Sequence, residues 1–318
     1  MHDPGEDAGA IARGQEMCRE IARRANANFQ HAARLLPVFR REYFYATYAA
    51  MRVIDDLVDE DFLGKPDEER GRSRGDVLAA VEAWERQTTQ FDTTNGPLHQ
   101  DIVTALAATA GRSDLGDWPW QALAGAMRRD AEEREMRTWL DFIDYCDGAT
   151  VAPAGIFVYL LSIRCGKDGV YRYPFDKNAR DYAKDLATYC YIVHILRDLA
   201  KDAAFSPRLI TIPADILENV GLKRDDIGDA LEKRSPTIER LTAELIERAL
   251  PYRDRGRTAL ADLSPRLGFI ERKVLNGLIA IYDALFKRAC ENSFAVTIGG
   301  SEMEEDLRRN HLRADGIN

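Results

Sequence analysis

The chain has 318 residues, which is long enough for one well-buried core or two smaller ones. Its 44 Lys and Arg against 53 Asp and Glu give a net charge of −9, which argues against a nucleic-acid partner because such a partner requires a dense basic surface. A hydrophobic content of 45% with 31% charged residues excludes a globally disordered chain.

Apolar residues recur every three or four positions along most of the chain, which is the period of an amphipathic helix. In chain order, this pattern predicts helices over residues 16–35, 37–61, 76–91, 98–111, 119–147, 150–164, 178–203, 235–263 and 268–290. Glycine and proline interrupt the pattern between these segments. Alternation typical of a strand is limited to residues 209–212. The chain is therefore predicted to be all-α.

The interruptions between the predicted helices are short, and no repeat of fixed period is visible. We therefore expect one domain over residues 1–318. Residues 1–14 and 299–318 are rich in glycine and charge, and we expect them to be mobile.

Nothing in the sequence indicates secretion or insertion into a membrane. The first fourteen residues are polar and acidic, unlike a signal peptide, and the longest apolar run, 149–163, is too short to cross a bilayer. The cysteines lack the spacing of a zinc site, so we expect reduced thiols in a cytoplasmic protein. They are Cys18, Cys146, Cys165, Cys190 and Cys290.

A first group of carboxylates lies at the end of the helix predicted over 37–61. Asp55 and Asp59 are four residues apart and share one helix face, with Asp56 beside them and Arg52 one turn earlier. Acidic groups near a helix C-terminus oppose the helix dipole and repel each other. Such a stripe is unfavourable unless a cation compensates it, although a solvated acidic helix end is the simpler interpretation.

A second pair of aspartates repeats the same spacing in the helix predicted over 178–203. Asp198 and Asp202 are four residues apart, and His194 and Tyr191 extend their stripe towards the N-terminus. Arg197 and Lys201 form a parallel basic stripe. The residues between them are mostly apolar, so this helix is expected to be largely buried, and buried aspartates need partners or ions.

Together the two carboxylate stripes indicate a metal-assisted reaction of a phosphorylated substrate. Paired carboxylates supply the oxygen ligands that Mg²⁺ prefers, and neighbouring arginines bind phosphate oxygens bidentately. Metal-bound diphosphate is a good leaving group, and an apolar, aromatic pocket would shield an allylic cation from water. Aromatic residues of the first helix are candidates for such a pocket or for plain core: Phe39, Tyr43, Phe44, Tyr45 and Tyr48.

At these motifs the chain resembles the squalene/phytoene synthase family. The resemblance covers residues 26–282 and rests on Asn28-Phe29, Arg34-Leu35-Leu36-Pro37, Tyr48 to Asp59, Gly125 to Asp130, Tyr145-Cys146 and Ile195 to Asp202. It implies an all-α helical bundle of the isoprenoid synthase type with a central cavity, and Mg²⁺-dependent ionisation of an allylic prenyl diphosphate. The implied metal ligands are Asp55, Asp56, Asp59, Asp198 and Asp202. The implied substrate-binding residues are Asn28, Phe29, Tyr48, Arg52, Arg197, Lys201, Arg208 and Tyr282.

The chain departs from the family pattern at several positions. Family members carry Gln and Asn where this chain has Tyr191 and His194, and Asp147 follows Tyr145-Cys146 in place of an aromatic or basic residue. The flap over 207–213 lacks its usual Tyr, and the segment 292–300 lacks basic residues. Several cationic groups expected for a second diphosphate are therefore absent from the pattern, and we predict that His194, Asp147 and Tyr191 act catalytically, as a base or as acceptor contacts.

Three hypotheses follow for the function. The first is a prenyltransferase that transfers the prenyl group to a small aromatic acceptor, as in the carbazole-type subgroup of secondary metabolism. The second is a head-to-head synthase that makes squalene, phytoene or a related polyene. The third is a helical assembly factor without catalysis, against which the four intact aspartates argue. The sequence leaves the acceptor, the prenyl chain length and the oligomeric state open.

Overall fold

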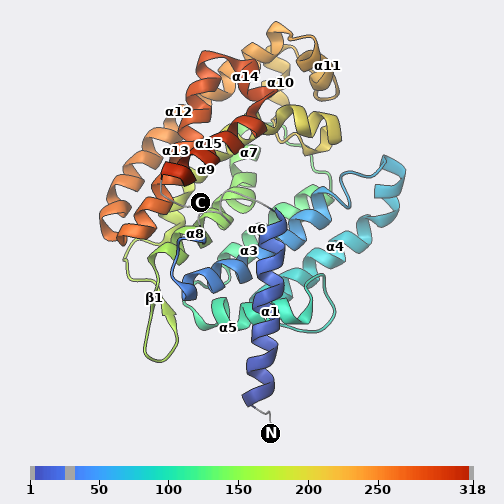
Figure 1. The fold of residues 1–318 in the computed structure, drawn as a ribbon. Helices are drawn as coiled ribbons and strands as arrows, with labels where there is room; N and C mark the ends of the chain where they lie inside the picture. Colours follow the sequence, from blue (N-terminus) through green and yellow to red (C-terminus); the bar gives the residue numbers. More distant parts are fainter. Residues whose placement is uncertain (1–3, 26–32, 315–318) are drawn as a thin grey trace. The chain divides into compact units, whose positions relative to one another are not determined.

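The computed structural model describes residues 4–25 and 33–314, and these residues are almost entirely helical (Figure 1). In chain order the helices are α1 Pro4–Ala25, α3 Val38–Asp59, α4 Asp67–Thr89, α5 Gln100–Thr109, α6 Trp118–Ala131, α7 Trp139–Cys146, α8 Ala152–Ser162, α9 Ala179–Phe205, α10 Ala214–Val220, α11 Ile227–Glu232, α12 Pro236–Leu263, α13 Phe269–Glu291, α14 Ser293–Thr297 and α15 Gly300–Ala314. Strands β1 (Arg164–Cys165) and β2 (Tyr171–Arg172) pair antiparallel. The all-α prediction is confirmed.

The differences from the predicted elements have local causes. The helix predicted over 119–147 is two helices, because the chain turns after α6 at Glu133, which has a positive φ of 51°. Residues 209–212 form no strand, and the two strands instead flank the turn that contains Gly169, whose φ is 72°. Between α7 and α8 the chain forms a wide π-helical turn, Asp147–Val151.

Helices are also present near both ends of the chain, where we predicted mobile segments. Helix α1 begins at Pro4, and α15 runs from Gly300 to Ala314. Ion pairs between side chains one turn apart support both helices, such as Arg24 with Glu20 at 3.0 Å and Arg309 with Glu305 at 3.1 Å. That residues 1–14 and 299–318 are mobile remains a prediction.

The chain folds into two compact units. Unit 1 comprises Met1–Glu133, Asp147–Ala183 and Leu267–Glu271, and unit 2 comprises Arg134–Cys146, Lys184–Arg266 and Arg272–Asn318. The chain passes between the units five times, and the single domain over 1–318 remains a prediction. No helix in the described part of the chain is long and apolar enough to cross a membrane.

Unit 1 is built around two buried tryptophans. Trp84 of α4 and Trp120 of α6 meet edge to face with ring centroids 6.0 Å apart, and both are almost fully buried. The indole of Trp84 donates a hydrogen bond of 2.7 Å to the carbonyl of Ala50 in α3. Helices α3, α4 and α6 are thereby fixed around one centre, because a buried indole N–H needs an acceptor.

Unit 2 is centred on α9, α12 and α13. Tyr189 of α9 donates a hydrogen bond of 2.8 Å to Asp283 of α13, and Arg253 and Arg257 of α12 donate to the same carboxylate at 3.1 and 3.0 Å. The Asp283 carboxylate thus joins the three helices. Burial opposes ionisation of Asp283, but the hydrogen bonds from Tyr189 and Arg253 lower its pKa below the ordinary value.

The crossing of α9 and α12 depends on Gly256. A Cβ atom at this position would lie 3.0 Å from the backbone of Leu186, so the two helices approach each other too closely for a side chain. We expect Gly256→Ala to destabilise the protein by about 1–3 kcal/mol through overpacking, measured by urea denaturation. The matched control is Gly277→Ala in α13, where a Cβ would meet nothing within 4 Å. That variant should be stabilised by up to about 1 kcal/mol, since alanine favours helix. Equal stability changes in the two variants would contradict the close crossing.

Candidate active site

The first aspartate motif lies at the C-terminal end of α3 in unit 1. Arg52 pairs with Asp55 at 3.2 Å, with Glu60 at 3.1 Å and also with Asp56. Burial opposes the charge of Arg52, but Asp55 and Asp56 raise its pKa above the ordinary value. Arg52 therefore supplies part of the positive charge that the acidic helix end requires. Asp55 and Asp59 have further contacts, so this stripe is partly compensated within the chain itself.

An apolar cavity of about 170 Å³ adjoins this motif within unit 1. Tyr48, Arg52 and Asp55 belong to its lining. The other lining residues are Phe44, Thr47, Met51, Leu123, Ala149, Pro153, Ile156, Phe157 and Leu160. Hydrocarbon walls therefore continue directly into a charged group of residues, an arrangement suited to a ligand with an apolar chain and an ionic end.

Two of the five aromatic residues that were candidates for a pocket, Phe44 and Tyr48, line this cavity. Phe44 and Tyr48 stack with centroids 5.3 Å apart and both line the cavity. Burial raises the pKa of Tyr48 to about 12, so its hydroxyl stays protonated. Tyr43 is instead core: it is fully buried and its hydroxyl lies 3.1 Å from that of Ser113. Phe39 stacks on Tyr171 outside the cavity lining.

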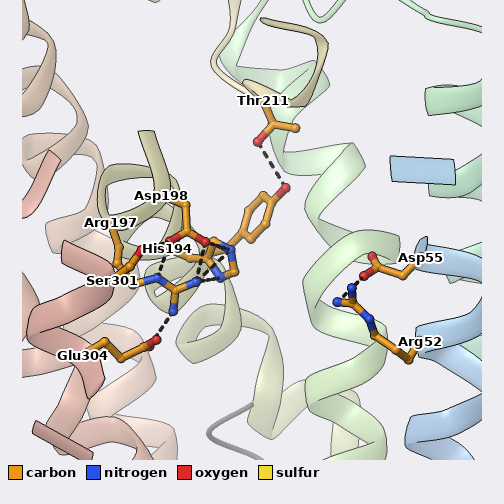
Figure 2. A network of polar contacts seen from close by, with 9 residues as sticks. Arg52, Asp55, His194, Arg197, Asp198, Thr211, Ser301 and Glu304 are labelled. Atoms are coloured by element: carbon orange, nitrogen blue, oxygen red, sulfur yellow. Dashed lines mark hydrogen bonds and ion pairs between the residues drawn. The ribbon is translucent and has the colours of Figure 1, made fainter. Parts of the chain in front are cut away.

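The second aspartate motif, on α9 in unit 2, forms a polar network with α15 (Figure 2). Asp198 receives hydrogen bonds from Arg197 at 2.7 and 2.6 Å, and its side chain is 9% exposed. The Nη1 atom of Arg197 pairs with Glu304 of α15 at 2.5 Å. Ser301, at the start of α15, donates to Asp198 at 3.1 Å.

The two aspartates of this motif have opposite electrostatics. Burial would raise the pKa of Asp198, but hydrogen bonds from Arg197 and His194 hold it well below the ordinary value. Burial and then repulsion from Asp198 raise the pKa of Asp202 to about 6. Among the described residues, none forms a hydrogen bond or ion pair with the Asp202 carboxylate. The ionised form of Asp202 is therefore disfavoured, although His194, Lys201 and Arg197 offset part of this effect.

The three residues predicted to be catalytic all have partners within their own unit. His194 Nε2 lies 3.0 Å from Asp198 Oδ2. The Tyr191 hydroxyl lies 3.1 Å from that of Thr211, and its ring stacks on Phe142 with centroids 6.0 Å apart. Asp147 opens the π-helical turn and accepts two hydrogen bonds from Arg180, at 3.0 and 2.7 Å. Their catalytic roles remain predictions.

The remaining predicted substrate-binding residues lie in varied surroundings. Tyr282 of α13 is buried, and its electrostatic neighbours include Arg197, Asp198 and Glu304, which places it beside the second motif. Lys201 is exposed on α9. Arg208 is exposed in the short turn Pro207–Leu209. Asn28 and Phe29 lie outside the described residues.

Sequence reasoning missed Ser301 and Glu304, which complete the network around Arg197. Both lie in the segment that we expected to be mobile. The available signal was the i,i+4 pairing of charges after Gly300, which indicates a helix but does not indicate its partner. In the described part of the chain, no three His, Cys, Asp or Glu residues already converge into a metal-binding group.

Comparison with known proteins identifies the family. The model of the squalene/phytoene synthase family matches residues 22–299. The chain belongs to the squalene/phytoene synthase family. The fold agrees with this membership: a squalene synthase (HpnC) from Alicyclobacillus acidocaldarius aligns over 92% of this chain and 97% of its own with a TM-score of 0.66 and 23% identity. A dehydrosqualene synthase in complex with ligand aligns over 98% of this chain and 100% of its own, with a TM-score of 0.69 and 16% identity.

Curated relatives of this squalene/phytoene synthase family member carry more specific names. The 15-cis-phytoene synthase of Enterobacter agglomerans is 25% identical over 71% of this chain and 70% of its own length. The phytoene synthase of Rhodobacter capsulatus is 28% identical over 74% of this chain and 62% of its own length. The 4,4'-diapophytoene synthase of Staphylococcus haemolyticus is 24% identical over 59% of this chain and 58% of its own length. The chain thus matches between 58% and 70% of the length of these relatives. Their names support the second of the three hypotheses, the head-to-head synthase, better than the aromatic-acceptor hypothesis that we ranked first.

Proposed function

We propose that this protein is a Mg²⁺-dependent head-to-head synthase that condenses two prenyl diphosphates, as phytoene and squalene synthases do. The observation that carries the proposal is the apolar cavity of unit 1, whose lining passes from Phe157 and Leu160 to Tyr48, Arg52 and Asp55. A prenyl diphosphate combines a hydrocarbon chain with a diphosphate, and the cavity offers matching walls for both. The curated relatives supply the type of condensation.

The donor atoms of both motifs fit Mg²⁺, which binds one or two carboxylates together with substrate phosphates and keeps several waters. In unit 1 the residues that would hold Mg²⁺ are Asp55 and Asp59, and in unit 2 they are Asp198 and Asp202. The unpartnered, raised-pKa carboxylate of Asp202 is the structural feature that favours a cation there. Bound Mg²⁺ would neutralise the charge that develops on the diphosphate as its C–O bond breaks.

The chain's own residues have distinct tasks in this proposal. Arg52 binds diphosphate oxygens, for which a guanidinium provides paired donors. The apolar side chains around the cavity exclude water, which would otherwise capture an allylic cation. The ring faces of Phe44 and Tyr48 stabilise such a cation by cation–π interaction, worth about 2 kcal/mol when desolvated.

Transfer to an aromatic acceptor would require a base that removes the ring proton, which could be the released diphosphate itself or a side chain such as His194 or Asp147. His194 and Asp147 are both partnered by charged groups, Asp198 and Arg197 in one case and Arg180 in the other. These contacts are compatible with a structural role as well as with a catalytic one, so the aromatic acceptor enters as an outcome of the test below.

The test measures Mg²⁺-dependent diphosphate release from dimethylallyl, geranyl, farnesyl and geranylgeranyl diphosphates, with product analysis by mass spectrometry. We expect release from farnesyl or geranylgeranyl diphosphate without any added acceptor, with a product containing two prenyl chains. Chelation of the metal should abolish the release. Release from dimethylallyl diphosphate only when carbazole or indole is added, with a prenylated ring as product, would contradict the proposal in favour of the aromatic acceptor.

A further inference from the structure

The start of α15 lies directly on the second aspartate motif. A Cβ atom on Gly300 would lie 2.9 Å from both the Cα and the carbonyl oxygen of Arg197, so the backbones of α15 and α9 are in contact there. One residue later Ser301 reaches Asp198, and one turn later Glu304 reaches Arg197 (Figure 2). Helix α15 is therefore docked onto the Arg197–Asp198 pair. It also lies beyond residues 22–299, which the family model matches.

The docked arrangement uses every acceptor position of the Asp198 carboxylate. An ionised carboxylate has about four lone-pair positions. Oδ1 is contacted by Arg197 Nε at 2.7 Å and by Ser301 Oγ at 3.1 Å. Oδ2 is contacted by Arg197 Nη2 at 2.6 Å and by His194 Nε2 at 3.0 Å. A metal ion can reach this carboxylate only if one of these partners leaves.

Arg197 is occupied in the same way. Its Nε and Nη2 atoms face Asp198, Nη2 also contacts His194, and Nη1 pairs with Glu304, while the side chain is only 10% exposed. A diphosphate would use the same guanidinium donors that these carboxylates now accept from. Diphosphate and the Glu304 carboxylate are both anionic acceptors, so they compete for one cation.

We propose that α15 is a substrate-responsive latch, in which Glu304 and Ser301 hold Arg197 and Asp198 in a closed arrangement that must open before this motif can bind metal diphosphate. The inference rests on the proposed function and concerns its control. Because docking of α15 and binding of diphosphate use the same groups, each weakens the other by the same factor. Weakening the latch must therefore tighten diphosphate binding.

The chain offers a matched pair of variants. Glu304→Gln removes the charge that competes for Arg197 and keeps the shape of the side chain. Glu305→Gln removes the same charge from the next residue, which pairs with exposed Arg309 at 3.1 Å. Both substitutions change the net charge of α15 equally, so a general electrostatic effect on an anionic ligand is the same in both.

The affinity of the full chain for inorganic diphosphate in excess Mg²⁺ is measured by isothermal titration calorimetry. We expect Glu304→Gln to tighten binding about tenfold, within the usual range of coupling between sites. Glu305→Gln should change it less than about twofold. If the wild type binds diphosphate, equal affinities in the two variants, or weaker binding in Glu304→Gln, would overturn the latch and leave the proposed function standing. Absence of binding in all three proteins would overturn both.

Hydrogen exchange of the wild-type protein provides a second measurement that needs no variant. We expect the backbone amides of residues 303–307 in α15 to exchange faster when Mg²⁺ and diphosphate are added together. Amides of residues 241–249 in α12 serve as the internal reference and should not change. Unchanged or slower exchange in α15, under conditions where calorimetry shows binding, would overturn the latch.

Discussion

Asp55→Asn should lower Mg²⁺-dependent diphosphate release by about 10²–10³-fold, because Asp55 would hold the Mg²⁺ that offsets the negative charge developing on the diphosphate, and loss of one such stabilising interaction costs about 3–4 kcal/mol. Asp55 is the carboxylate that both belongs to the first motif and lines the apolar cavity. The rate constant kcat is measured by coupled detection of released diphosphate, with thermal unfolding as the check that the variant is folded.

The matched control for this variant is Asp61→Asn. Asp61 lies just beyond the end of α3, is exposed and does not line the cavity, so the same change of charge there should alter kcat less than about threefold. The Mg²⁺ concentration for half-maximal activity should rise only in Asp55→Asn. Activity of Asp55→Asn within threefold of wild type would remove Asp55 from the proposed metal site.

The second large effect is on stability, and it separates the two aspartates of α9. Asp198→Asn should lower the free energy of unfolding by about 3–5 kcal/mol in the presence of a chelator, because it leaves the nearly buried guanidinium of Arg197 without its bidentate partner. The same substitution also weakens the contacts of this side chain with His194 and Ser301.

Asp202→Asn should instead raise the free energy of unfolding, measured in the same way in the presence of a chelator. Burial and Asp198 disfavour the ionised form of Asp202 and raise its pKa to about 6 from the 3.8 of an ordinary carboxyl. A carboxyl whose folded pKa is raised destabilises the folded protein when ionised, so wild type loses stability as pH rises from about 4 to 6. Asp202→Asn should therefore be more stable than wild type by about 1–2 kcal/mol above pH 6, after allowance for solvent screening. The gain should vanish below about pH 4. A gain that is independent of pH would contradict this electrostatic origin.

The elements that sequence predicted well are those whose evidence is local. Helix α9 was predicted over 178–203 and is Ala179–Phe205, because a long apolar period and its flanking polar residues suffice to define it. The four-residue spacing of Asp198 and Asp202 correctly placed them on one buried helix, since that spacing is a property of the helix itself. The family could be recognised for the same reason, as its motifs are short runs within single helices.

What sequence could not predict are partners far apart along the chain. Arg197 pairs with Glu304, which is 107 residues away, and its role in substrate binding stays a prediction. No local pattern encodes such a contact, because it depends on where the chain end packs. The same holds for Asp147, whose partner Arg180 lies 33 residues further on, and for the break after α6, which Arg70 and Glu133 stabilise through a hydrogen bond of 3.0 Å.

The close approach of Gly300 to Arg197 has an evolutionary consequence. A single methyl group at residue 300 would collide with the α9 backbone and push the start of α15 away. A substitution at residue 300, one position beyond the matched residues 22–299, would therefore loosen the start of α15 while both aspartate motifs stay unchanged. Natural selection could in this way adjust the substrate concentration at which the enzyme responds, by mutations in a part of the gene where catalytic residues are not at risk.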